Sequence, residues 1–262
     1  MSLTGKSPAD TYKDLMYVDN NNSGVDSTTR AIKTGNGSST ALAVSDRALQ
    51  VLPSTDNTTT FRVRNASGTS KLIVDTTNNT VKALGHHVNT QYAYFGVANG
   101  ISSGWATGTH YAVPFAGNNH SNVDQDNFTF GTGTDPATSF TTADATATDA
   151  SLLVPLMWYV PDAISIDGVT SIEGADAATG DTTRMHLYSY TFTSGSTSAL
   201  TSGTLLAHND DVTNAGSEQA YLSTWTVDSA AVTAGKVILA TFRSDSVNSD
   251  YSLNVTVKYH LT

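Results

Sequence analysis

The sequence contains no cysteine and only two glutamates, Glu173 and Glu218, in 262 residues, and only 14% of its positions are charged. The absence of cysteine excludes disulfides, thiolate chemistry and cysteine-based zinc sites, so packing or association must stabilise the fold. The shortage of charged residues removes the side chains that usually cover helix surfaces. The abundant Thr, Ser, Asn, Asp and Gly are instead typical of strands and turns.

Long apolar runs are also missing. The longest charge-free apolar stretch, residues 152–161, contains two prolines and is too short to span a bilayer. The first ten residues, MSLTGKSPAD, have no apolar stretch behind their lysine. The sequence therefore predicts neither a membrane span nor a signal peptide.

The net charge of −10 is divided unevenly along the chain. Residues 1–85 hold nine Lys/Arg against seven Asp/Glu, a net charge of +2, whereas residues 86–262 hold four against sixteen, a net charge of −12. Phosphate binding requires clustered Lys and Arg. The acidic part therefore makes nucleic acid an improbable partner, and no membrane partner is expected.

Residues 1–85 hold too few apolar side chains for a compact core in one chain. Ser7, Pro8 and Asp10 form a helix-start signal, and Tyr12, Leu15 and Met16 follow at helical spacing, which predicts one short helix. Residues 61–84 alternate as short strands joined by tight turns. Such small units are marginal alone. We expect threefold self-association to bury an apolar set consisting of Phe61, Val63, Leu72, Val74 and Val81.

Residues 86–262 have the pattern of a large antiparallel β-sandwich or jelly roll, with no convincing helix between the strands. The clearest strand is residues 251–261, where polar residues alternate with an apolar set consisting of Tyr251, Leu253, Val255, Val257, Tyr259 and Leu261. Six further strands are expected at 91–98, 110–115, 152–160, 184–192, 219–227 and 236–242. The predicted fold class is therefore all-β: an extended trimeric β stem with one short helix, then a jelly-roll-like sandwich.

The N-terminal segment resembles a known family. The residues that carry the resemblance are Thr11-Tyr12-Lys13-Asp14-Leu15, the turn at 19–24, Val25-Asp26, Arg30, Gly35-Asn36-Gly37 and Ala41-Leu42-Ala43-Val44-Ser45. This succession is similar to the start of bacteriophage tail-fibre and head-fibre proteins, especially those of marine phages. The match covers about the first fifth of the chain, and residues 61–84 resemble the beaded strands of trimeric fibre shafts.

The resemblance implies a homotrimer that is made in the host cytoplasm and displayed on the virion surface. Its first segment would attach to phage capsid or tail proteins, and we expect Tyr12, Leu15 and Met16 to make the docking contact. The expected function is structural, as a capsid fibre or decoration protein. The alternative is a tail fibre that recognises a host-surface glycan. No enzymatic activity and no cofactor are expected.

Patterns that suggest catalysis have simpler interpretations. Residues 100–104, GISSG, satisfy the Gly-x-Ser-x-Gly pattern, but that motif needs a preceding strand and a following helix. A glycosidase would need two carboxyls flanking a sugar cleft, and the two glutamates occupy separate, loop-like contexts. We therefore predict no catalytic residues.

Three segments could hold a metal, but each has a simpler interpretation. For two of them it is a solvated loop, and for the third it is an ordinary junction between the stem and the sandwich. Residues 124–127 and 208–211 offer oxygen ligands suited to calcium, without the Gly and distal Glu of a calcium loop. His86 and His87 would meet their copies in a trimer and could hold a transition metal, or could bond to backbone and water. No metal site is predicted.

Two interpretations of the aromatic residues remain: they could line a sugar-binding face, or they could belong to the core or the trimer interface. Trp158 and Trp225 are expected in the core or the trimer interface. The tyrosines could serve either purpose; they are Tyr92, Tyr94, Tyr188 and Tyr190. Trp105, beside glycine in a predicted loop, is the best candidate to face a ligand.

Overall fold

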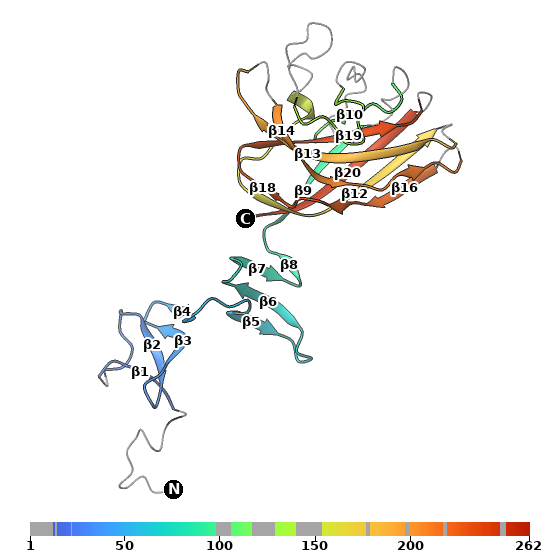
Figure 1. Cartoon of the computed structure of the whole chain (residues 1–262). Coiled ribbons are helices and arrows are strands. Elements are labelled where there is room, and N and C mark those ends of the chain that lie inside the picture. Colours follow the sequence, from blue (N-terminus) through green and yellow to red (C-terminus); the bar gives the residue numbers. More distant parts are fainter. Residues whose placement is uncertain are drawn as a thin grey trace. The chain divides into compact units, whose positions relative to one another are not determined.

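In the computed structural model the chain divides into two compact units, residues 1–88 (unit 1) and 89–262 (unit 2) (Figure 1). The sequence pattern places the corresponding boundary near residue 85. The structure describes residues 13, 15–21, 23–97, 106–116, 129–139, 154–176, 179–196, 200–216, 219–246 and 250–262. Antiparallel strands dominate both units. The expected all-β fold is therefore confirmed.

Unit 1 consists of two four-stranded antiparallel sheets that follow one another along the chain. Sheet 1 has the strands β1 (Met16–Val18), β2 (Arg30–Thr34), β3 (Ser39–Val44) and β4 (Leu49–Val51). Sheet 2 has β5 (Phe61–Arg64), β6 (Ser70–Asp75), β7 (Thr80–Ala83) and β8 (His86–His87). In each sheet the spatial order equals the chain order, so every connection is a local hairpin.

Glycines in left-handed conformations set two of these hairpins. Gly37 has a φ of +87°, and its N–H donates to the Thr34 carbonyl at 2.8 Å. Gly68 has a φ of +83°, and its N–H donates to the Asn65 carbonyl at 2.9 Å. An L side chain is strained at such a φ, so glycine permits the tight turn and fixes the strand register.

The expected helix through Met16 is wrong at its C-terminal end, because Met16 begins a strand. Met16, Tyr17 and Val18 pair with residues 32–34 of β2. Ladder hydrogen bonds to a neighbouring strand outweigh a weak local helical preference. Tyr12 lies outside the described residues. Within those residues the one helical element is the 3-10 turn η2 (Val154–Leu156).

Unit 2 is a sandwich of two antiparallel sheets. Sheet 3 has the order β16-β12-β20-β9, with β18 beside β12; sheet 4 has the order β10-β19-β13-β14-β17, with β11 beside β19 and β15 beside β13. The strands are β9 (Thr90–Val97), β10 (Tyr111–Val113), β11 (Trp158–Tyr159), β12 (Ile164–Asp176), β13 (Thr182–Phe192), β14 (Leu200–His208), β15 (Val212–Thr213), β16 (Gln219–Thr224), β17 (Thr226–Val227), β18 (Ala231–Val232), β19 (Lys236–Ser244) and β20 (Asp250–Leu261).

The long strands of unit 2 have jelly-roll connectivity. Successive strands cross repeatedly between the two sheets: β9 and β12 lie in sheet 3, β10 and β13 in sheet 4, and β19 in sheet 4 precedes β20 in sheet 3. The first strand, β9, pairs with the last, β20, so that Thr90 lies opposite His260. Figure 1 shows the two sheets facing one another.

The main core lies between sheets 3 and 4. Phe95, Val255 and Val257 of sheet 3 meet Leu187 and Phe242 of sheet 4 there, and all five are essentially inaccessible. A second cluster covers the other face of sheet 4 and includes Phe130, Leu156 and Tyr190. Sheet 4 is therefore buried on both faces, whereas sheet 3 has one face in the core.

The alternation predicted for residues 251–261 is confirmed over most of the strand. Tyr251, Leu253, Val255 and Val257 are buried. Towards the end of the strand the alternation fails: Tyr259 is half-buried, His260 is buried and Leu261 is exposed. The expected strand at 152–160 is correct only at β11, because residues 154–156 form the turn η2 around Pro155. Proline lacks the N–H that a ladder requires.

No helix among the residues described is both long enough and apolar enough to cross a membrane.

Candidate interaction surfaces

One face of sheet 2 gathers all five residues that the sequence assigns to a trimer interface. Phe61 pairs with Val74, which pairs with Val81, and Val63 pairs with Leu72. Directly paired residues and residues two apart in a strand point to the same side of a sheet. Phe61, Val63 and Val81 are exposed, and Leu72 and Val74 are half-buried. We call this set the apolar face of sheet 2.

The opposite face of sheet 2 is largely charged. Arg62 pairs with Ile73, which pairs with Lys82, and Lys82 pairs with His87. The sheet is therefore amphipathic, and its polar side suits water. Nothing in the described part of unit 1 supplies a core for its apolar side.

Sheet 1 repeats this arrangement. Val18 pairs with Ile32, and Leu42 pairs with Val51, so that apolar side chains share one side. Arg30, opposite Val44, and Thr34, opposite Met16, also lie on that side. The apolar residues there are Met16, Val18, Ile32, Leu42, Val44, Leu49 and Val51. Leu49 is 70% exposed and Met16 62%. Among the described residues of unit 1, Ala43 alone is buried.

The turn that carries the phage-fibre resemblance is organised by Asp26. Its carboxylate accepts the Thr28 N–H at 2.8 Å, the Asn20 amide at 3.2 Å and the Arg30 guanidinium at 3.1 Å. The Thr28 N–H above all, and then the Arg30 charge, lower the pKa of Asp26. Arg30 balances the charge of this carboxylate, so we assign Asp26 a structural role in holding the turn.

The expected docking residues are placed only in part. Leu15, just before β1, and Met16 are exposed, and Tyr12 lies outside the described residues. Met16 belongs to the apolar side of sheet 1. Its role in attachment to a particle stays a prediction.

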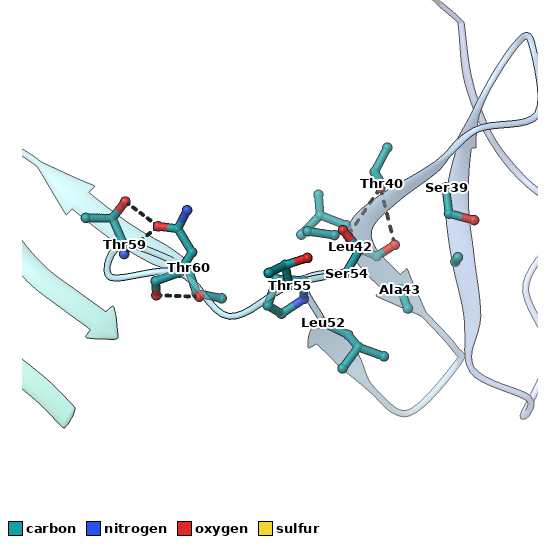
Figure 2. A pocket seen from close by; sticks show the side chains of 13 residues that line it. Ser39, Thr40, Leu42, Ala43, Leu52, Ser54, Thr55, Thr59 and Thr60 are labelled. Atoms are coloured by element: carbon teal, nitrogen blue, oxygen red, sulfur yellow. Dashed lines mark hydrogen bonds between the residues drawn. The ribbon is translucent and has the colours of Figure 1, made fainter. Parts of the chain in front are cut away.

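A pocket of about 580 Å³ lies in unit 1 between β3 and the segment that follows β4 (Figure 2). Its lining consists of small apolar and hydroxyl residues, namely Ala31, Ser39, Thr40, Ala41, Leu42, Ala43, Leu52, Pro53, Ser54, Thr55, Asn57, Thr59 and Thr60. Several polar groups bond within the chain: the Thr40 hydroxyl donates to the Ile32 carbonyl at 2.8 Å, and the Thr59 N–H donates to Asn57 Oδ1 at 2.8 Å. None of these lining residues carries a titratable side chain that could serve in catalysis.

The outer face of sheet 3 is exposed and carries four large apolar or aromatic side chains. Ile172 of β12 pairs with Leu222 of β16, and Tyr92 and Tyr94 lie two residues apart on β9. Each of these four side chains is more than half exposed. The strand between them, β20, presents Asn254 and other polar residues on this face.

The other expected aromatic candidates are buried: Tyr188, Tyr190, Trp158 and Trp225. Placement of the two tryptophans in the core is therefore confirmed.

A polar layer of three histidines lies on the loop-covered face of sheet 4. The His110 and His186 rings are 5.0 Å apart, and His186 and His208 are 6.4 Å apart. His186 Nε2 lies 3.4 Å from Asp135, and His208 Nδ1 lies 2.8 Å from Asp228. Burial, reinforced by the charges of His110 and Arg184, lowers the pKa of His186 to about 3, so that this imidazole is neutral near pH 7.

Glu173 is a buried carboxyl group between the two sheets of unit 2. It lies on β12 and accepts the hydroxyl of Thr183, on β13, at 2.8 Å, while its second oxygen has no hydrogen-bond partner among the residues that the structure describes. Burial raises the pKa of Glu173 to about 7, against the opposing effect of the Thr183 bond. The loop-like context expected for Glu173 is wrong, because the residue lies within strand β12. The signal that could have found it is the alternation of Val169, Ser171 and Glu173, all of which are buried.

Two of the other candidate sites fall outside the part of the chain that the structure describes. Residues 100–105, including Trp105, and residues 124–127 lie outside the described residues. In the 208–211 segment, Asp211 lies 3.5 Å from the Arg184 guanidinium and His208 Nδ1 lies 2.8 Å from Asp228, so both side chains already have a partner. His86 and His87 form β8 at the edge of sheet 2.

Neither the protein-family models nor the curated proteins include a match to this chain.

Proposed function

We propose that the chain is a structural protein of a bacteriophage particle, a homotrimeric capsid fibre or decoration protein displayed on the particle surface. The observation that carries the proposal is the make-up of unit 1. Two amphipathic sheets leave their apolar sides uncovered, and Ala43 alone is buried among the described residues of unit 1. A unit of this size needs a core, and further copies of the chain would supply it.

Association would bury the apolar face of sheet 2 against its copies. Full burial of a Val or Phe side chain stabilises by about 1.5–3 kcal/mol, so completing burial of half-covered side chains adds roughly 1 kcal/mol each. Five such residues in each of three chains supply on the order of 15 kcal/mol before the entropy of association is subtracted. Threefold closure also repeats the acidic unit 2 three times, which favours multivalent display.

The N-terminal resemblance supports a phage particle as the location. The turn that carries it is held by Asp26, Asn20 and Arg30, which explains physically why those residue types occur together. In this proposal the first segment binds a capsid or tail protein, and unit 2, with its net charge of −12, faces solvent.

The mass of the full chain in solution tests the trimer, with two neighbouring residues of β7 as a matched pair. Val81→Asp places a charge on the apolar face of sheet 2, whereas Lys82→Asp changes the opposite face. Light scattering should give three times the chain mass for the wild type and for Lys82→Asp, and a lower mass for Val81→Asp. A wild-type monomer would refute the proposal.

Attachment is tested separately in particles. Tyr12→Ala combined with Leu15→Ala should reduce incorporation of the protein into phage particles, and unchanged incorporation would refute the docking assignment. Free protein added to host cells distinguishes the two expected functions. Inhibition of infection would indicate a receptor-binding tail fibre in place of a decoration protein.

A further inference from the structure

We infer that the outer face of sheet 3 is the surface on which the unit 2 domains of neighbouring copies pack against each other. The occupant of this face is a second copy of the same chain. The inference rests on the proposed trimer and extends its contacts from unit 1 to unit 2.

The first argument is the distribution of apolar side chains over this face. Leu222 is 74% exposed and lies beside Ile172, towards the β16 edge, while Tyr92 and Tyr94 lie on β9 at the opposite edge. These two patches flank the polar strand β20, which presents Asn254 between them. Large side chains exposed in groups usually mark an interaction surface.

The second argument is the covalent connection between the units. Strand β9 begins at Thr90, two residues after unit 1 ends at Val88. An extended residue spans at most about 3.6 Å, so Tyr92 lies within roughly 14 Å of Val88 whatever the angle between the units. If three copies of unit 1 associate, their three β9 strands therefore start close together.

The third argument is charge. Unit 2 carries sixteen acidic residues against four basic ones, so most surfaces of two copies repel each other. Over the central rows of the outer face, the paired residues of β16, β12, β20 and β9 are neutral. They comprise Leu222, Ile172, Asn254 and Gly96 in one row and Thr224, Thr170, Thr256 and Tyr94 in the next. Lys258 opposite Tyr92 and Asp167 beside His260 lie towards one end. Asp176 pairs with Asp250 at the other end, so the rows over which two copies can meet without placing acid against acid are the central ones.

Threefold symmetry specifies how the patches meet. In a closed ring, one surface of each copy contacts a different surface of the next. Two separate apolar patches on one face fit this requirement, with Ile172 and Leu222 of one copy against Tyr92 and Tyr94 of the next. A glycan could stack on the tyrosines, but it would leave the aliphatic Ile172 and Leu222 in water.

Cross-linking of the full chain tests the contact, and the absence of native cysteine removes any background. The test protein combines Leu222→Cys with Tyr94→Cys and is treated with a short bismaleimide. We expect covalent trimers on a denaturing gel. The control combines Val154→Cys, an exposed position in η2, with Tyr94→Cys and should give a several-fold weaker trimer band.

The outcomes separate this inference from the proposed function. Cross-linking no stronger than in the control, from a protein that light scattering shows to be trimeric, overturns the inference and leaves the trimer intact. A monomeric full chain overturns both. Loss of glycan binding in Tyr92→Ala with Tyr94→Ala, without specific cross-linking, would replace the interface with a sugar site.

Discussion

Replacement of Glu173 by glutamine should change the pH dependence of stability in a defined direction. Glutamine fills nearly the same space, and its amide oxygen still accepts the Thr183 hydroxyl, but it cannot ionise. In the wild type, the buried carboxyl has a pKa of about 7, above the ordinary value of 4.5. Glu173→Gln therefore removes one titration from the interior and little else.

The sign follows from proton binding. The folded state holds the Glu173 proton more tightly than the unfolded chain, so its stabilising effect is complete below about pH 4.5 and is lost as the pH rises through 7. A pKa difference of about 2.5 corresponds to roughly 3 kcal/mol. Glu173→Gln should therefore resemble the wild type at pH 4 and be more stable by about 3 kcal/mol at pH 8.

His186 acts in the opposite direction, and this determines how the assay is designed. Its pKa is lowered to about 3, so its contribution to stability is lost as the pH falls from about 6.5 towards 3. The wild-type curve alone therefore mixes two opposed effects. The difference between wild type and variant removes the His186 contribution because both proteins contain it.

Urea unfolding at several pH values, followed by tryptophan fluorescence, measures this difference. All three tryptophans lie in unit 2, so the signal reports the domain that contains Glu173. Asp162→Asn, which removes an exposed carboxylate, is the control and should stay within about 0.5 kcal/mol of the wild type. A difference between Glu173→Gln and the wild type that does not change between pH 4 and pH 8 would refute the reasoning.

Two further substitutions probe the packing of unit 2. A Cβ at Gly203 would lie 2.6 Å from the Tyr190 ring and 2.8 Å from Thr138 Cα, so Gly203→Ala should lower the unfolding free energy by about 1–3 kcal/mol, measured by urea denaturation. An unchanged midpoint would contradict this close approach. Ser171→Ala removes the acceptor of the Trp225 indole N–H at 2.8 Å and should cost about 1–3 kcal/mol. Adding Trp225→Phe should then cost less than it does in the wild type, and full additivity would argue against the bond.

The alternation of apolar and polar residues was sufficient to predict the fold class and several strands, but it did not predict β12. This strand of 13 residues lies near the centre of sheet 3, and its pairing with β20 shifts between Ile166 and Gly168. The shift changes which alternate residues point inward, from Ile164 and Ile166 to Val169, and so breaks the period of two. A search for strict alternation therefore misses a strand that contains such a bulge.

The surfaces were predictable to different degrees. The alternation of Phe61, Val63, Leu72 and Val74 is enough to place them on one side of a hairpin, because hairpin pairing is local. The patch of Ile172 and Leu222 joins strands that are about 50 residues apart, and its partner on β9 lies further away still. Such contacts depend on strand order, which the pattern within a strand does not encode.

The pairing of β9 with β20 makes unit 2 a module with a single point of attachment. Thr90 and His260 are neighbours in the ladder, and the Asn89 amide donates to the Leu261 carbonyl at 2.8 Å. Both ends of the domain therefore emerge together, as in domains that tolerate exchange or insertion. A different head could replace this one through a single short junction without rebuilding the segment that precedes it. A reporter fused after His260 would lie beside that junction.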